Sequence, residues 1–316
     1  MNGVLVTGAT TPVGERLVRA LAVGDRFTSV VAVSNEPPPP WLSDIPGGRV
    51  EYVSVDLCRA REVRALLHGL ARERGVTAIV HTAFHRAASH DAEEARRLNV
   101  DATRELVGQA AGHPSIRRFV YGSSAEVYRV TSDLPILVGE DHPLEMSAEA
   151  PVRIRHRVEA DVCVCTQFGL GDLRVQVLRF AEIFAEDSGS QLWDYLQTRV
   201  ALRPLGFDPM VNLLSPADAV RALVLALLSE ATGIFNIPGA DTLPLSLVIR
   251  KAGRVGLAVP APFLTKLYEL RASTLGLEFR YDLNHRRFHF SAVLDGARAE
   301  RLLGYVPREP VTWPTG

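Results

Sequence analysis

The chain has 316 residues, of which 47% are hydrophobic and 22% charged, and its formal net charge is −1. This length exceeds the usual size of one hydrophobic core, so we expect a large domain with a smaller one appended to it. The balanced charge and the lack of an apolar run of membrane-spanning length exclude nucleic acid and membrane as expected partners.

The first residues and the cysteines indicate the compartment. The opening MNGVLVTGAT has neither the basic segment nor the long apolar stretch of a signal peptide, so we expect a cytoplasmic protein. Cys58, Cys163 and Cys165 have spacings that suit neither a disulfide scaffold nor a zinc site, and we interpret them as reduced packing residues. His81 and His85 straddle a predicted strand end without a third ligand cluster, so we expect no metal.

A glycine turn follows the first predicted strand. Residues 4–6 are an apolar run typical of a buried strand, and residues 7–14, TGATTPVG, lead into a predicted helix. A strand, a tight turn and a helix N-terminus together present backbone N–H groups and a positive dipole end to a pyrophosphate. Thr11 stands where a GxxGxxG pattern has its second glycine. The turn therefore predicts a dinucleotide site with an altered phosphate contact.

Short β-branched runs alternate with helical patterns over the first 180 residues. Apolar residues recur at helical spacing over 63–70 and 98–110. This alternation predicts βαβ units and a doubly wound parallel sheet of the α/β class, with a ligand crevice at the carboxyl ends of the strands. The predicted strands are residues 4–6, 29–33, 50–55, 77–81, 118–122 and 173–178.

Beyond residue 180 the pattern becomes irregular. Residues 215–218 form a capping box that begins a predicted helix, and residues 233–237 predict a further strand that rejoins the sheet. The predicted nucleotide-binding domain is residues 1–180 plus about 211–238. The remaining residues, 181–210 plus 239–316, form the predicted smaller C-terminal substrate lobe.

Several short motifs occur in an order that resembles one protein family. Over nearly the whole chain they resemble the extended short-chain dehydrogenase/reductases, in particular the NAD-dependent epimerase/dehydratase family and its UDP-glucose 4-epimerase-like members. The resemblance implies a Rossmann-like fold and an NAD(P)-dependent oxidoreductase or epimerase. The motifs are TGATTPVG at 7–14, Asp56-Leu57, His81-Thr82-Ala83, Asn99-Val100, YGSSAEVY at 121–128, Leu178-Arg179, Phe235-Asn236-Ile237 and LGYVP at 303–307.

The resemblance also implies a set of cofactor-binding residues. Asp56 would accept a hydrogen bond from the adenine amine, with a helix cap as its alternative role. Asn99 would support the site, with a polar surface position as its alternative. The full set comprises Gly8, Thr10, Thr11, Pro12, Val13 and Gly14 around the pyrophosphate, Asp56 and Leu57 near the adenine, and Thr82, Ala83, Phe84, Asn99 and Ser123 along the rest of the cofactor.

The end of the second predicted strand reads Val33-Ser34-Asn35. This place normally carries an acid for the ribose hydroxyls of NAD or a basic group for the 2′-phosphate of NADP. Ser34, the cofactor-contacting residue that we predict here, is neither. We expect NAD, with NADP as the alternative, because no nearby positive charge offsets a buried phosphate.

The family's catalytic pair is missing from the segment where it belongs. Family members carry a tyrosine and, four residues later, a lysine that lowers the tyrosine pKa and makes it a proton shuttle. Residues 141–166 contain neither residue type. Anchored on Glu159, the family pattern places Arg155 at the lysine, where it would bind the ribose, and Pro151 at the tyrosine. Neither side chain exchanges protons near neutral pH.

Ser124 is the retained catalytic candidate, because a hydroxyl at this family position hydrogen-bonds a substrate oxygen. Tyr128 is a second catalytic candidate, with a packing role as its alternative. Glu126, His85 and His156 are further groups that could supply a proton.

The predicted substrate lobe lacks the arginine with which nucleotide-sugar epimerases bind a diphosphate. The corresponding stretch carries Met210 and Val211, which cannot form a phosphate fork, so a UDP-sugar is disfavoured. A basic segment further on forms either an anion site or a solvated helix face. Its members are Arg280, His285, Arg286, Arg287 and His289.

Two hypotheses follow. The first is an NAD(P)-dependent enzyme that acts on a hydroxyl or keto group of a small-molecule substrate, with Ser124 orienting the oxygen. The second is a catalytically degenerate NAD(P)-binding sensor whose cofactor occupancy a partner reads. Apolar residues on the predicted helices 92–109 and 155–167 favour a homodimer, with a monomer as the alternative because the sheet could cover the same faces.

Overall fold

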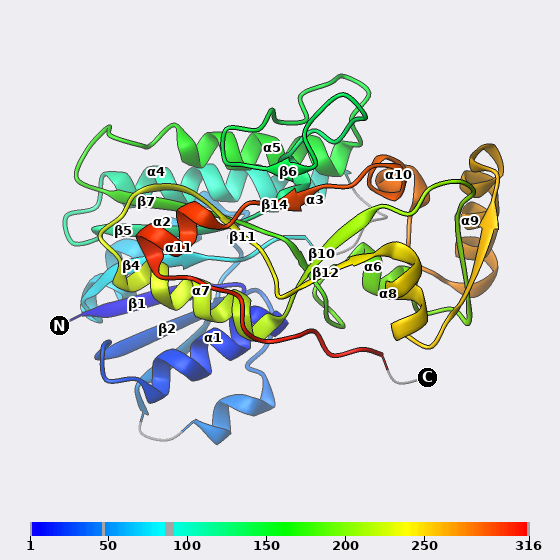
Figure 1. The fold of residues 1–316 in the computed structure, drawn as a ribbon. Helices are drawn as coiled ribbons and strands as arrows, with labels where there is room; N and C mark the ends of the chain where they lie inside the picture. The colour runs from blue at the N-terminus through cyan, green and yellow to red at the C-terminus, as the bar shows by residue number, and fades with distance from the viewer. Residues whose placement is uncertain (1, 46–47, 86–91, 315–316) are drawn as a thin grey trace.

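The computed structural model describes residues 2–45, 48–85 and 92–314. Within them, a sheet of seven parallel strands lies between two layers of helices, in the order β11-β7-β5-β4-β1-β2-β3 (Figure 1). The strands are β1 (Gly3–Thr7), β2 (Ser29–Ser34), β3 (Val50–Ser54), β4 (Val76–His81), β5 (Arg118–Ser124), β7 (Arg174–Phe180) and β11 (Gly233–Ile237).

The predicted α/β fold with a doubly wound parallel sheet is confirmed. Each strand predicted from the β-branched runs occurs, and β11 rejoins the sheet beside β7. The chain winds outward from β1 to β3 and then returns to continue from β4 on the other side of β1. A ligand crevice is expected at this reversal, outside the carboxyl ends of the strands.

Alternating residues of the strands face two separate hydrophobic clusters, as expected of strands buried on both faces. In β1, Val4 and Val6 pack with one helical layer, whereas Leu5 packs with the other. The first layer contains α1 (Pro12–Val23), α7 (Pro216–Leu228) and α11 (Ala297–Leu303). The second contains α2 (Ala60–Leu66), η3 (Leu67–Ala71), η4 (Arg97–Ala102), α4 (Thr103–Ala111) and α5 (Val152–Cys165), and α3 (Ala92–Arg96) leads into η4.

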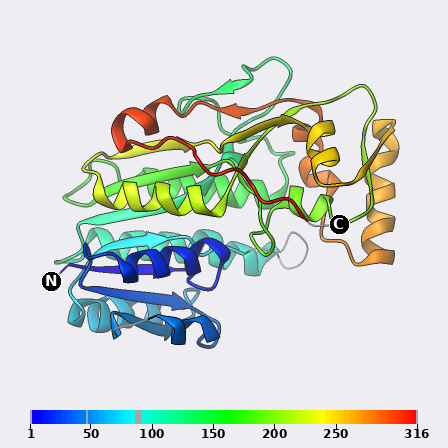
Figure 2. The ribbon, with the colours of Figure 1, turned by 60° about the horizontal axis from the view of Figure 1, so that its bottom comes forward.

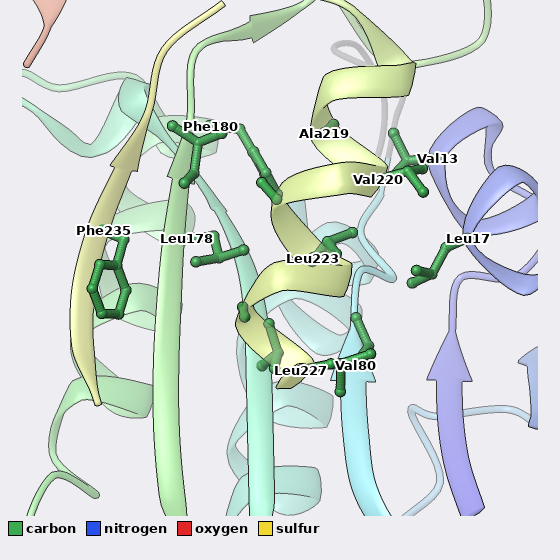
Figure 3. Packing of buried hydrophobic residues seen from close by; sticks show 14 of the residues in the cluster. Val13, Leu17, Val80, Leu178, Phe180, Ala219, Val220, Leu223, Leu227 and Phe235 are labelled. Carbon is green, nitrogen blue, oxygen red and sulfur yellow. The ribbon is translucent and has the colours of Figure 1, made fainter. Parts of the chain in front are cut away.

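Helix α7 fills the centre of the first layer. Figure 3 shows its Leu223 and Leu227 among the buried side chains that this helix shares with the sheet and with α1. Ser215 accepts a hydrogen bond from the Asp218 backbone N–H at 3.1 Å, so the predicted capping box starts this helix. No helix among the described residues combines the length and the apolarity needed to cross a membrane.

A smaller lobe lies beyond the carboxyl ends of the strands (Figures 1 and 2). Its core centres on Tyr195, whose ring lies 5.0 Å from that of Phe279 and 4.9 Å from that of Phe288 between centroids. The elements of the lobe are β8 (Glu182–Ile183), α6 (Gln191–Tyr195), β9 (Val200–Pro204), β10 (Met210–Leu214), β12 (Asp241–Pro244), α8 (Leu245–Lys251), β13 (Val255–Val259), α9 (Ala261–Leu275) and α10 (Tyr281–His289).

The C-terminal segment leaves the smaller lobe, packs on the large domain and then returns to the lobe. β14 (Val293–Leu294) pairs with β6 (Leu137–Val138), and α11 and Tyr305 pack in the cluster that contains α1 and α7. Val311 then returns to the core of the lobe. Assigning all of residues 239–316 to the lobe therefore missed this crossing, because hydrophobic periodicity gives the type of a helix and not the surface on which it docks.

We predict that Leu223→Ala lowers the free energy of unfolding by about 2–5 kcal/mol, because it leaves a cavity between α7 and the sheet. Leu228→Ala on the same helix is the matched control, since Leu228 is 44% exposed whereas Leu223 is fully buried. The control should change the stability by at most about 0.5 kcal/mol in urea unfolding. Equal losses in the two variants would contradict the packing described for α7.

Candidate cofactor and active site

The turn between β1 and α1 admits only glycine at two positions. Gly8 has a φ of +72°, and an added Cβ would lie 2.8 Å from the Ala83 backbone nitrogen. At Gly14 a Cβ would lie 2.0 Å from the Gly8 carbonyl oxygen. Glycine at these positions therefore lets the turn pack closely against the segment after β4 and against the start of α1, as in the predicted dinucleotide-binding turn.

Thr11 replaces the missing glycine with a helix cap. Its Oγ1 accepts a hydrogen bond from the Gly14 backbone N–H at 3.0 Å and donates one to the Gly8 carbonyl at 2.9 Å. Beside it, the hydroxyls of Thr10 and Ser34 lie 3.0 Å apart and tie the turn to the end of β2. The side chain that stands in place of glycine thus stabilises the turn from within.

Asp56 and Leu57 follow the end of β3. The Asp56 carboxylate accepts a hydrogen bond from the Cys58 backbone N–H at 2.9 Å and pairs with the Arg59 Nε at 3.1 Å. These contacts form a turn before α2, whose N-cap residue is Arg59, so Asp56 does not cap the helix and its contact with the adenine stays a prediction. Leu57 is buried in the core beneath it.

A cleft lies outside the carboxyl ends of β4, β5 and β7. It brings together six residues of the predicted site, namely Thr11, Val13, Thr82, Phe84, Ser123 and Ser124. An adjoining cavity is lined by Ala83 and Asn99. The Asn99 Oδ1 accepts a hydrogen bond from the His85 backbone N–H at 2.7 Å, so Asn99 orders the segment that follows β4.

Helix α5 lines the cleft with Arg153 and Arg157, and not with Arg155. Arg153 and Arg157 lie four residues apart on one face of the helix, whereas Arg155 is exposed. Glu159, which anchored the predicted register, pairs with Arg96 at 2.8 Å and Arg104 at 3.0 Å across the neighbouring helices. Arg153 and Arg157 are therefore spaced by four residues, as the family's tyrosine and lysine are, and lie two residues after Pro151 and Arg155 in the chain.

The sequence contained one signal for this register. Arg153, Arg157 and Asp161 are spaced by four residues and share a helix face, and Asp161 is fully buried. A charged residue within an otherwise apolar helix segment marks the inward face, because a buried charge requires a partner. Sequence reasoning missed both Arg153 and Arg157 because it relied on Glu159.

Glu126 forms the centre of a buried charge cluster. Its Oε2 lies 2.7 Å from the Arg157 Nε and 3.8 Å from the Arg153 Nη2. Burial raises the pKa of Glu126, but Arg157, Arg153 and Arg287 outweigh it and lower that pKa to about 2. Glu126 is therefore an ionised carboxylate near neutral pH and holds no proton to donate.

Arg153 has unused hydrogen-bonding capacity. Its Nη2 donates to the Gly189 carbonyl at 3.0 Å, but its Nε and Nη1 are buried without a hydrogen-bond partner among the described residues. Buried donors of this kind are normally satisfied, so they point to a ligand oxygen in the cleft. Arg157 also stacks over the Phe84 ring, 5.1 Å from its centroid, which fixes the guanidinium at the cleft wall.

Asp161 anchors α5 to the sheet. Its carboxylate accepts hydrogen bonds from the Arg179 Nε at 3.0 Å, the Arg179 Nη2 at 2.6 Å and the Ser123 Oγ at 2.5 Å. Asp161 and Arg179 are both almost completely buried. Since Ser123 belongs to β5 and Arg179 to β7, this group joins one helix to two central strands.

Tyr128 lies on the far side of the same polar group. The Arg179 guanidinium stacks over its ring at 4.8 Å, and its hydroxyl donates to the Asn236 Oδ1 at 2.6 Å. Burial raises the pKa of Tyr128 to about 12, so the phenol stays protonated near neutral pH. These contacts support the packing role that was the alternative for Tyr128.

None of the histidines His81, His85 and His156 belongs to the described residues that line the cleft. The two ring nitrogens of His81 lie within hydrogen-bond distance of Thr7 and Thr103, at 2.7 and 2.9 Å, and burial lowers its pKa to about 4. The polar side chains that line the cleft are therefore serine and threonine hydroxyls, Ser124 among them, and charged groups.

A second pocket, called the chamber below, adjoins the cleft, and the two share Ala181 and Glu182 as lining residues. Met210 and Val211 contribute to its apolar wall. Of the basic residues predicted near the C-terminus, Arg287 lines this chamber. The others serve elsewhere: Arg280 pairs with Asp282, Arg286 pairs with Glu145, and His285 and His289 contact backbone carbonyls.

The amino-acid sequence is similar to those of known proteins over most of the chain. The model of the NAD dependent epimerase/dehydratase family matches residues 4–237. An uncharacterized protein of Mycobacterium tuberculosis is 29% identical over 322 residues, which cover 96% of this chain and 80% of that relative. The 3-diazoavenalumate denitrifying reductase of a Streptomyces species is 28% identical over 327 residues, covering 99% of this chain and 98% of the reductase.

Solved structures share the fold at low sequence identity. UDP-glucuronic acid 4-epimerase from Bacillus cereus in complex with NAD has a TM-score of 0.71 and 15% identity, with 98% of this chain and 94% of that chain covered. At this identity the likeness shows the fold and leaves the substrate to be argued from the side chains.

We predict that Asp161→Asn lowers the free energy of unfolding by about 3–5 kcal/mol, because Arg179 is left as a buried charge without its counterion. Glu159→Gln on the same helix is the matched control. Its carboxylate is 40% exposed, so the loss should stay within about 1 kcal/mol. Urea unfolding of the two variants measures the difference, and a loss of less than about 1 kcal/mol in Asp161→Asn would contradict the anchoring role.

Proposed function

Because this chain belongs to the NAD-dependent epimerase/dehydratase family, we propose that it is an NAD-dependent oxidoreductase that reduces a keto group of a small molecule with an arginine-based catalytic site. The carrying observation is the pair Arg153 and Arg157, which line the cleft beside Ser124 at the spacing of the family's tyrosine and lysine. NADP is the alternative cofactor.

The residues present fit the cofactor. Gly8 and Gly14 leave no room for a side chain at the turn, and the N-terminus of α1 presents its dipole there. Arg157 would hold the nicotinamide ribose in place of the family lysine. When bound, the nicotinamide exchanges a hydride with the substrate. The NAD in the complex with the Bacillus cereus epimerase supports this choice of cofactor.

Ser124 and Arg153 would stabilise the substrate oxygen. Hydride addition to a carbonyl carbon moves an electron pair onto the oxygen, and a hydroxyl and a guanidinium donate hydrogen bonds to that developing charge. Arginine keeps its proton, so it cannot remove one from an alcohol. We therefore propose a reduction in which the hydride of bound NADH forms the new C–H bond and water in the open cleft supplies the proton to the product oxygen. The name of the Streptomyces relative, a reductase, agrees with this direction.

The sensor hypothesis remains the second candidate for a specific reason. The described residues that line the cleft include no tyrosine, lysine, histidine or cysteine, and the pKa of Glu126 lies far below neutral. A protein that binds cofactor without a tyrosine, lysine or histidine in the described lining of the cleft suits a conformational response to cofactor occupancy. Both the enzyme and the sensor would bind the cofactor, but the enzyme alone would turn over a substrate.

We predict that Arg157→Gln weakens NADH binding by about tenfold or more, which is the loss of a charge-assisted hydrogen bond to the ribose. Arg155→Gln, the matched control, should leave the dissociation constant within about twofold, since Arg155 is exposed. Calorimetric titration of NADH into each folded variant gives the comparison. Weaker NADH binding in Arg155→Gln with normal NADH binding in Arg157→Gln would contradict this prediction and would place Arg155 at the ribose, as the register based on Glu159 does.

Turnover separates the enzyme from the sensor. We expect NADH absorbance to fall with a member of a panel of aryl ketones and keto acids, and Ser124→Ala to lower kcat by about a hundredfold with NADH affinity retained. Unchanged kcat in Ser124→Ala would remove this residue from the mechanism. Tight NADH binding with no turnover across the panel would contradict the enzyme and favour the sensor.

A further inference from the structure

We propose that the chamber beside the cleft binds the body of an apolar carboxylic acid, and that Arg287 pairs with its carboxylate. The proposal rests on the proposed function, because it names the substrate class of the same site. It selects a monoanionic, non-nucleotide substrate whose reacting carbon would reach Ser124 past Ala181 and Glu182, the two residues that line both spaces.

The chamber has an apolar wall suited to a ring or an alkyl chain. Leu192, Met210 and Val211 form one part of it, and Phe288, Phe290 and Leu294 form another. Apolar pockets with few polar groups bind mainly through the removal of apolar surface from water, and those polar groups fix the orientation. The body of the ligand is therefore hydrophobic.

Arg287 is the arginine that lines this chamber, and its ion pair with Glu182 is long. Its Nη1 lies 4.0 Å from the Glu182 Oε2, at the limit of an ion pair. The charge of Arg287 also lowers the pKa of Glu126, but that carboxylate is paired with Arg157 at 2.7 Å.

The Glu182 Oε1 is held by the Ser190 hydroxyl at 2.6 Å and the Leu192 backbone N–H at 3.3 Å. Because these two hydrogen bonds hold Glu182 in place, its carboxylate does not move closer to Arg287. The Arg287 guanidinium can therefore donate hydrogen bonds to a second carboxylate.

The charge count favours a monoanion. The charged residues among those lining the cleft and the chamber are three arginines, Arg153, Arg157 and Arg287, and two glutamates, Glu126 and Glu182. One positive charge is left over. A carboxylate neutralises it, and the planar guanidinium fork matches a carboxylate in both geometry and charge.

A nucleoside diphosphate fits the chamber poorly. Its two phosphates would meet a single arginine and the fixed carboxylate of Glu182. The amide of Asn212, the polar group of β10 in this wall, already donates to the Gly239 carbonyl at 3.1 Å and to the Thr242 hydroxyl at 2.7 Å. It is therefore occupied and does not serve to recognise a base.

Three probes test the proposal in the intact protein with saturating NADH. They are cinnamate, cinnamamide and UDP-glucose, titrated by calorimetry into the wild type, Arg287→Gln and Arg280→Gln. Cinnamate should bind the wild type about tenfold more tightly than its neutral amide, as expected for a charge-assisted pair. Arg287→Gln should abolish this preference. Arg280→Gln also removes one positive charge, but Arg280 pairs with Asp282 and lines neither the cleft nor the chamber. This variant should therefore still bind cinnamate more tightly than cinnamamide.

The possible results separate this inference from the proposed function. Tighter binding of UDP-glucose than of cinnamate, equal binding of cinnamate and cinnamamide, or an unchanged preference in Arg287→Gln would each overturn the inference while NADH binding stands. If NADH fails to bind, the proposed function fails, and the same titrations without cofactor then decide whether the chamber prefers the carboxylate. Thermal unfolding of each variant confirms that it is folded before titration.

Discussion

The buried ion pair between Asp161 and Arg179 is the interaction on which the site depends. It joins α5 to β7, and the hydrogen bond from Ser123 extends it to β5. Because a charge buried this deeply must keep its partner, the pair fixes the rotation of α5 about its axis. Arg157 and Arg153 follow at four-residue intervals on the same face, so that rotation points both guanidinium groups into the cleft.

In the proposed site, two arginines at the spacing of the family's tyrosine and lysine change what the site can do. A tyrosine–lysine pair moves a proton, whereas two guanidinium groups supply a constant positive field and directed donors. The Glu126 carboxylate offsets part of this charge and holds Arg157 in place, leaving two donor atoms of Arg153 unpaired. These charges and donors would stabilise negative charge on a bound molecule, and both proposals, the reduction of a keto group and the binding of a carboxylate, rest on this property.

Much of the architecture was predictable because it rests on local patterns. Alternating strand and helix signals gave the sheet, and Gly8 and Gly14 gave the turn between β1 and α1. The register of α5 was not predictable in the same way, since Arg153, Arg155 and Arg157 alternate along the sequence. A shift of two residues turns a side chain by about 200° around a helix, from the solvent to the cleft.

Other differences arose from contacts that no local pattern encodes. The capping bonds of Thr11 depend on one rotamer that closes on Gly14, and the return of α11 to the large unit depends on which surface receives its apolar face. We infer that α5 positions the Arg157 guanidinium at the nicotinamide ribose of the bound cofactor. A crystal structure with NADH tests it most directly: we expect the Arg157 guanidinium to donate to the nicotinamide ribose while Arg155 faces solvent. A ribose contacted by Arg155, or a nicotinamide bound away from Arg157 and Ser124, would contradict the account.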